Sequence, residues 1–153
     1  TRCLLVLALV LAAVGVRAAD RVPANESGSE RPLKIGVTLH PYYSWTRNIV
    51  GSAGVEVIPV IRGDIDAGNY QPSPEDIAKL GDLDAIVVNG VGHDEFIFDM
   101  IKASGNTKIT VIRPNDSVPL MRATNGEGMN SHTFISFSNA IQQTYFIARA
   151  LGD

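Results

Sequence analysis

Short apolar runs that alternate with amphipathic stretches are the feature that most constrains how this chain can fold. The four runs are rich in β-branched and aliphatic residues and have the length of strands; they cover residues 33–39, 55–61, 83–90 and 108–114. The stretches with helical apolar spacing cover residues 40–54, 73–81, 94–105 and 138–153. Strands that alternate with helices form parallel sheets with helices on their faces. The order therefore predicts an α/β fold: a four-stranded parallel sheet flanked by helices.

Two of these segments carry additional local signals. The helix at residues 73–81 has Ser73 as its N-cap, Pro74 at its first position and Gly81 at its end. The last helix is expected to start at Ser138 or Asn139. Both predictions concern helix boundaries, which side-chain caps and backbone restrictions define.

Residues 1–19 have the composition of a secretory signal peptide. Arg2 gives a basic start, and Leu4 to Val14 is an uninterrupted apolar run. This run is shorter than the roughly 20 residues that span a bilayer, which disfavours a membrane anchor. Residues 20–32 are polar, with Pro, Gly and Ser, and are expected to form a flexible leader. The folded unit is then residues 33–153.

Composition limits the partners and the metal ligands. The 153 residues are 45% hydrophobic and 19% charged, which is enough apolar material for one core. A net charge of -3 gives no basic surface for nucleic acid, so no nucleic-acid partner is expected. The only cysteine, Cys3, lies in the predicted signal peptide. Any metal site in the mature chain must therefore use histidine, carboxylate or amide ligands.

All three histidines follow predicted strands. Open parallel sheets bind ligands outside the carboxyl ends of their strands. His40 comes after the first strand, His93 after the third, and His132 near the end of the long loop after the fourth. One histidine alone is as readily structural as functional, but three at one edge favour a divalent transition metal, for which imidazole is a common ligand.

Two segments resemble the metal-specific periplasmic binding proteins of ABC transporters, the group that captures zinc, manganese or ferrous iron. The segments are NYQPSPEDIAKLGDLDAIVVNG, residues 69–90, and NSHTFISFSNAIQQTYFIARAL, residues 130–151. Members of the family typically read D-P-H-x-Y-x-P-x-P-x-D before a helix and an ADLIIYNG-like strand, and later P-H-x-W at a helix entry. The resemblance extends over residues 34–151.

Carried over residue by residue, the resemblance gives one ligand and one departure. His132 matches the family's second histidine ligand, with Phe134 in the place of the aromatic residue. The metal-binding histidine of the first motif aligns with Gly68, so His93 is the preferred replacement and His40 the second choice. The other residues that match the first motif are Asp66, Tyr70, Pro72, Pro74 and Asp76.

The resemblance also implies an architecture and a function. Family members have two α/β lobes joined by a long helix, and the second lobe supplies further ligands. Residues 33–153 would then be the N-terminal lobe and would end at the start of that helix. The implied function is capture of a divalent transition metal in the periplasm, zinc first with manganese or iron as alternatives, and delivery to an ABC permease. We expect a monomer without catalytic activity.

Two other classes of function remain open at this point. An adhesion or interaction protein would use the aromatic residues Tyr42, Tyr43 and Trp45 as a contact patch, although a cluster that packs against the sheet explains them better. A metal-dependent hydrolase would use His93 with Asp94 and Glu95, but neighbouring residues at a helix entry point in different directions.

Overall fold

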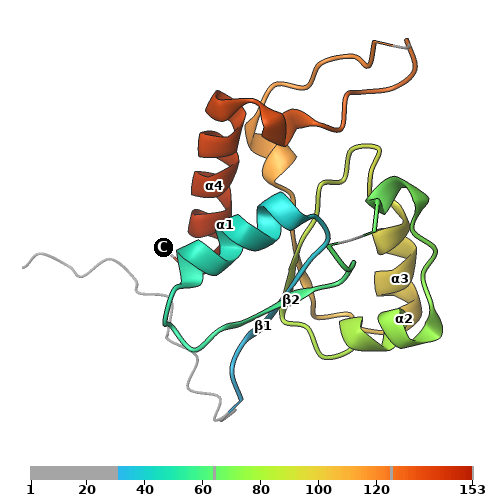
Figure 1. Ribbon diagram of the computed structural model, residues 1–153. Coiled ribbons are helices and arrows are strands. Elements are labelled where there is room, and N and C mark those ends of the chain that lie inside the picture. The colour runs from blue at the N-terminus through green and yellow to red at the C-terminus, as the bar shows by residue number, and fades with distance from the viewer. Residues whose placement is uncertain (1–30, 64, 125, 153) are drawn as a thin grey trace, which may run out of the picture. The chain divides into compact units, whose positions relative to one another are not determined.

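Four parallel strands form one sheet at the centre of the fold (Figure 1). The computed structural model describes residues 31–63, 65–124 and 126–152, so the predicted signal peptide and most of the predicted leader lie outside the described residues. The spatial order is β2-β1-β3-β4. The strands are β1 (Lys34–Val37), β2 (Glu56–Pro59), β3 (Ala85–Val87) and β4 (Thr110–Ile112). The predicted four-stranded parallel sheet is confirmed.

The register of the sheet places all four carboxyl ends at one edge. Val37, the last residue of β1, is paired with Pro59 of β2 and with Val87 of β3. Val87 is in turn paired with Ile112, the last residue of β4. The loops that leave these four strands therefore start beside one another, as expected for the ligand-binding edge of a parallel sheet.

Helices cover both faces of the sheet. In Figure 1, α1 and α4 lie on one side of the strands and α2 and α3 on the other. The helices are α1 (His40–Val50), α2 (Pro74–Leu80), α3 (Phe96–Ser104) and α4 (Phe137–Gly152). Within the residues that the structure describes, no helix is both long and apolar enough to cross a membrane.

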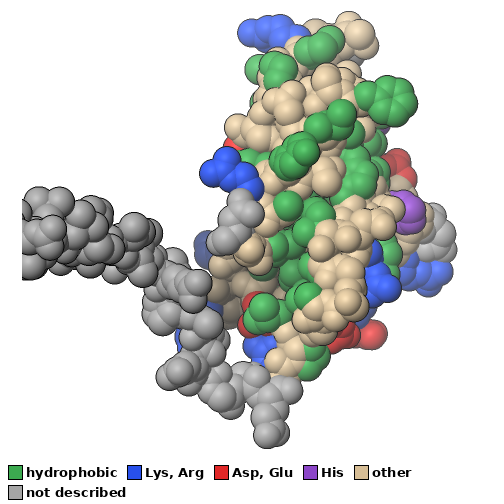
Figure 2. Space-filling view, turned by 90° about the vertical axis from the view of Figure 1, so that its left-hand side faces the viewer, with side chains coloured by type: hydrophobic (Ala, Val, Ile, Leu, Met, Phe, Trp, Pro, Cys, Tyr) green, Lys and Arg blue, Asp and Glu red, His purple; other side chains and the backbone are tan. Residues whose placement is uncertain are grey.

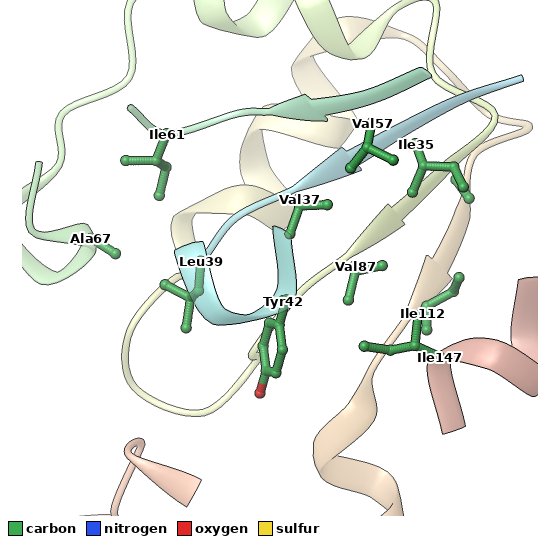
Figure 3. Packing of buried hydrophobic residues seen from close by; sticks show 11 residues of the cluster. Ile35, Val37, Leu39, Tyr42, Val57, Ile61, Ala67, Val87, Ile112 and Ile147 are labelled. Carbon is green, nitrogen blue, oxygen red and sulfur yellow. The ribbon is translucent and has the colours of Figure 1, made fainter. Parts of the chain in front are cut away.

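Each face of the sheet has its own hydrophobic core. Alternate residues of a strand point to opposite faces, so Val87 belongs to one core and Ile86 to the other. The first core includes Tyr42 of α1 and Ile147 of α4 and is drawn in Figure 3. The second includes Ile97 of α3, with Leu80 and Met100. Burial on both faces explains why β3 is apolar throughout.

Local sequence signals account for the helix boundaries. The Ser73 hydroxyl accepts a hydrogen bond from the Asp76 N–H at 3.2 Å, and the Asp76 carboxylate accepts one from the Ser73 N–H at 3.1 Å. This capping box and Pro74 start α2 as predicted. The predicted start of α4 at Ser138 or Asn139 is slightly late. The Ala140 N–H already donates to the Ser136 carbonyl at 2.8 Å, so the helix begins at Phe137.

The outer face of α4 is apolar and open. Phe137, Ile141 and Tyr145 follow one another at intervals of four residues, and their side chains are 90%, 58% and 68% exposed. Figure 2 views the molecule from the side on which α4 lies and shows hydrophobic side chains gathered there. No described residue covers this face.

Candidate metal site

The structure brings His93 and His132 into contact at the carboxyl edge of the sheet. His93 lies in the loop between β3 and α3, and His132 directly precedes the short 3-10 helix Thr133–Ile135. Their Nε2 atoms are 3.3 Å apart, and their ring centroids are 4.6 Å apart with an angle of 81° between the planes. The loops after two strands that are neighbours in the sheet, β3 and β4, thus supply one imidazole each.

The separation of the His93 and His132 Nε2 atoms matches the spacing of two ligands on one metal ion. Two imidazole nitrogens that each lie about 2.0–2.1 Å from a tetrahedral ion are about 3.3 Å apart. The observed Nε2–Nε2 distance is 3.3 Å. The pair can therefore bind one ion without a change in the separation of its nitrogens.

The surroundings of His93 favour the neutral imidazole that a metal needs. Burial lowers the pKa of His93 below its ordinary value, and the charge of a protonated His132 lowers it further. The carboxylates of Asp66, Asp94 and Glu95 act in the opposite direction but do not outweigh these two effects. A proton consequently competes less with a metal ion for His93 than for an exposed histidine.

Gly68 borders the histidine pair, although it has no side chain to offer. A Cβ placed on Gly68 would lie 4.0 Å from Nδ1 of His93 and 3.5 Å from Oδ1 of Asp66. The Asp66 carboxylate holds this loop by accepting from the Gly68 N–H at 3.0 Å and from the Asn69 amide at 2.8 Å. The loop that carries Gly68 therefore lies beside His93, as the alignment with a ligand position requires.

His40 is not part of this group. It is the exposed first residue of α1, its ring centroid is 6.3 Å from that of Tyr43, and a Cβ on Gly63 would lie 3.4 Å from its ring. It lines a separate hollow of about 190 Å³ between the ends of β1 and β2. Among the described residues, no three His, Cys, Asp or Glu side chains converge closely enough to hold a metal ion.

The expectation that all three imidazoles converge is therefore wrong for His40. All three histidines do follow strands at the predicted edge, but the loops differ in reach. Only Thr38 and Leu39 separate His40 from β1, so His40 stays beside the end of β2. His93 comes six residues after Val87, which lets its loop extend to the segment that follows β4.

A buried carboxylate fixes the loop that carries His93, and the sequence reading did not identify it as such. Asp94 is fully buried and accepts hydrogen bonds from the Thr38 hydroxyl and from the backbone N–H groups of Asn89 and Gly90, the latter two at 2.7 Å. These three donors satisfy the carboxylate and join the end of β1 to the end of β3. The loop is thereby anchored one residue from His93.

A buried network of polar side chains fixes the segment that carries His132. The Asn115 carboxamide oxygen accepts from the Thr133 hydroxyl at 2.5 Å and from the Gln143 amide at 2.7 Å. The Asn115 amide donates to the Asn89 carbonyl at 2.9 Å. Thr133 directly follows His132, so the network connects the ends of β3 and β4 and helix α4 to this imidazole.

A larger hollow of about 770 Å³ opens beside His132. It lies between the loop that contains Gly92 and the segment that runs from Leu120 to His132. Its charged lining residues have both signs: Arg113 is positive, and Glu95 and Glu127 are negative. His132 is one of its lining residues, whereas His93 is not, and the mixed charge of the lining does not select an anion or a cation.

Comparison with known proteins places the chain among metal-binding components of uptake systems. In a structure of FpvC from Pseudomonas aeruginosa in complex with Ni²⁺, the similar chain is 48% identical with a TM-score of 0.72, over 80% of this chain and 43% of that one. The zinc-binding protein AdcA of Streptococcus pyogenes serotype M3 is 27% identical over 71% of this chain and 20% of its own length. The manganese-binding lipoprotein MntA of Halalkalibacterium halodurans is 25% identical over 91% and 44%, respectively.

These comparisons also show how much of each relative is represented. The chain spans between 20% and 44% of the lengths of these three proteins. The family model described as zinc-uptake complex component A, periplasmic, matches residues 35–153, which include all three histidines and the whole sheet except Lys34 at the start of β1. The chain therefore belongs to the family of zinc-uptake complex component A, the periplasmic metal-binding components of uptake systems.

Proposed function

We propose that this protein captures a divalent transition metal outside the cytoplasm for delivery to an ABC permease, with His93 and His132 as ligands. The observation that carries the proposal is the 3.3 Å separation of the two Nε2 atoms. It equals the spacing of about 3.3 Å that one tetrahedral ion imposes on two imidazole nitrogens. Family membership and the metals named for the relatives support the same function.

Zinc is the first choice of cargo. Manganese and nickel are alternatives that a titration must separate, and iron is a further alternative. Imidazole ligands suit zinc and nickel, whereas carboxylates would shift the preference towards manganese. The relatives divide in the same way, since AdcA is named for zinc, MntA for manganese, and FpvC is seen with nickel. Two imidazoles alone do not decide among these ions.

We further propose that residues 33–153 are the N-terminal lobe of a two-lobe, monomeric periplasmic protein, and that a second lobe supplies the remaining ligands. A pair of histidines leaves coordination positions open, and a metal held by so few ligands is bound weakly. The relatives are more than twice as long as the region they share with this chain. The exposed apolar face of α4, with Phe137 at its start, also supports a covering lobe.

The structure offers less support for a hydrolase. Asp94, the residue next to His93, is fully buried and already accepts three hydrogen bonds, so it cannot serve as a general base. The Glu95 carboxylate accepts from the Gly92 N–H at 2.8 Å at the start of α3. We therefore propose binding and release of the metal without catalysis.

An adhesion role also lacks its proposed contact patch. Tyr42 is fully buried, and its ring centroid lies 5.4 Å from that of Trp45 in an edge-to-face contact. Tyr43 and Trp45 pack against the first hydrophobic core. These aromatic residues stabilise the fold and leave no cluster for a partner.

Calorimetric titration with Zn²⁺, Ni²⁺ and Mn²⁺ tests the proposed function. We expect the 153-residue chain to bind at least one of these ions and the His132→Ala variant to bind it more than about 100-fold more weakly, the upper end of what the loss of even an outer-shell partner costs. His40→Ala is the matched control and should change the affinity less than about twofold, since His40 lies outside the pair. Equal losses in the two variants would contradict the assignment.

A further inference from the structure

Asn89, the second residue after β3, is hydrogen-bonded to both histidine-bearing loops. Its side-chain amide donates to the Ser131 carbonyl at 3.0 Å, one residue before His132. Its backbone N–H donates to the Asp94 carboxylate at 2.7 Å, one residue after His93. A single fully buried residue thus connects the two segments that carry the imidazoles.

The remaining polar groups of Asn89 are also occupied. The carboxamide oxygen accepts from the Val91 N–H at 3.0 Å, and the amide nitrogen also donates to the Tyr42 hydroxyl at 3.3 Å. The backbone carbonyl accepts from the Asn115 amide at 2.9 Å. A buried carboxamide with both donors and its acceptor in use has one favourable orientation. Asn89 is consequently held rigidly and can hold its neighbours in turn.

We propose that Asn89 is a positioning residue that sets the separation of His93 and His132. The inference rests on the proposed function, in which both imidazoles bind the same ion. Asn89 does not reach the ion itself and acts through Ser131 and Asp94. Residues that orient metal ligands typically change metal affinity by about 10- to 100-fold when they are replaced. Asn89 would therefore control affinity without being a ligand.

The Asn89→Asp substitution tests this role with little change in size. The carboxylate can still accept from the Val91 N–H, but it has no N–H for the Ser131 carbonyl and repels that oxygen. We expect Ni²⁺ binding to weaken about tenfold or more. The Ser131 carbonyl loses its hydrogen bond to residue 89, while the bond from Asn115 to the backbone carbonyl of residue 89 and the two ligands themselves remain.

Asn106 offers a matched control near the amino ends of β3 and β4, at the end of the strands opposite to the histidines. Its carboxamide oxygen also accepts from a backbone N–H two residues later, that of Lys108 at 3.1 Å. Its amide donates to the carbonyls of Leu80 and Leu83 at 2.9 and 2.8 Å. Asn106→Asp therefore removes equivalent donors away from the histidines, and Ni²⁺ affinity should change less than about twofold.

A spectroscopic signature separates positioning from general stability. With Cu²⁺ as the probe, electron paramagnetic resonance of the wild-type chain should show hyperfine coupling to two imidazole nitrogens, and Asn89→Asp should show coupling to one. A purely structural role would lower the thermal unfolding midpoint and leave this pattern unchanged. Asn89→Ser is a second variant, because its hydroxyl can still accept from the Val91 N–H but cannot reach Ser131. It should give the same change.

The possible outcomes are distinct. If the Asn89 variants fold and keep both the wild-type Ni²⁺ affinity and the two-nitrogen pattern, the positioning role is overturned while the proposed function stands. If neither variant folds, Asn89 serves stability, and the positioning role is likewise overturned. If the wild-type chain binds no metal, the proposed function fails, and the inference fails with it.

Discussion

The His93–His132 pair and His40 lie at the same edge of one sheet but in different environments. The pair is held by loops that buried polar residues fix on both sides, Asp94 on one and Asn115 on the other. His40 starts a helix at the surface, where its ring lies beside that of Tyr43. Position at the carboxyl edge thus brings a histidine near a potential site, whereas the length and anchoring of its loop decide whether it joins one.

The largest expected effect is the loss and recovery of one ligand. His93→Ala should weaken the metal binding of the wild-type chain more than about 100-fold, and Gly68→His in the same background should restore much of the lost affinity. The reason is that a Cβ on Gly68 would point to the place of the His93 ring, 4.0 Å from its Nδ1. If the new imidazole contributed about 1.4 kcal/mol, the dissociation constant would fall tenfold. Calorimetric titration of the single and double variants measures both steps.

Gly63→His in the His93→Ala background is the control for this recovery. A Cβ on Gly63 faces the ring of His40 at 3.4 Å, so a histidine there joins the separate hollow and should restore nothing. If both Gly68→His and Gly63→His restored metal affinity, or if neither did, the proposed difference between the His93–His132 pair and the surroundings of His40 would be contradicted.

A smaller effect should follow from strain in the loop before His93. Gly92 has a φ of 73°, and for residues with a Cβ this left-handed region costs roughly 1–2 kcal/mol. Gly92→Ala should lower the free energy of unfolding by about this amount and weaken metal binding as the loop shifts. Urea denaturation and metal titration provide the two measurements.

Gly63→Ala is the matched substitution beside His40. Gly63 does not have a positive φ, and a Cβ there would make ordinary contact with the His40 ring. We expect little change in either unfolding or metal affinity. If Gly63→Ala weakened metal binding as much as Gly92→Ala, His40 would have to belong to the site after all.

The smallest effect concerns the pH dependence of stability without metal. Because the folded state lowers the pKa of His93 below 6.5, the unfolded chain binds more protons at this residue in the window between the folded and unfolded pKa values. Stability from this source is complete above the unfolded pKa of about 6.5 and is lost as the pH falls from there towards the lower folded pKa. His93→Gln should remove this contribution to the slope of the free energy of unfolding against pH. Urea denaturation at a series of pH values measures that slope. An unchanged slope would show that His93 does not titrate differently in the two states.

The fold was predictable because its signals are local or periodic. Ser73, Pro74 and Gly81 delimit α2 through capping and backbone restrictions that need no tertiary context. The alternation of strands and helices then determined a parallel sheet. The start of α4 was harder to predict from the sequence. The helix begins at Phe137 because the Ala140 N–H donates to the Ser136 carbonyl, and a backbone hydrogen bond leaves no signal in the side chains.

The site was predictable only in part, because whether the histidines converge depends on the length and direction of the loop that carries each of them. His132 and His93 were expected at one edge and do meet, but their sequence positions gave no means of excluding His40. The buried network was missed because polar residues in loops resemble solvated ones. Its one visible signal is a polar residue within three positions of the end of an apolar strand, as with Asn89 after β3 and Asn115 after β4.

X-ray absorption spectroscopy of the Ni²⁺-loaded chain tests most directly whether one ion is shared by the two histidines. We predict scattering from two imidazoles per ion in the wild-type chain and in His40→Ala, and from one in either His93→Ala or His132→Ala. A two-imidazole spectrum that survives the loss of His93 or of His132 would contradict the shared site.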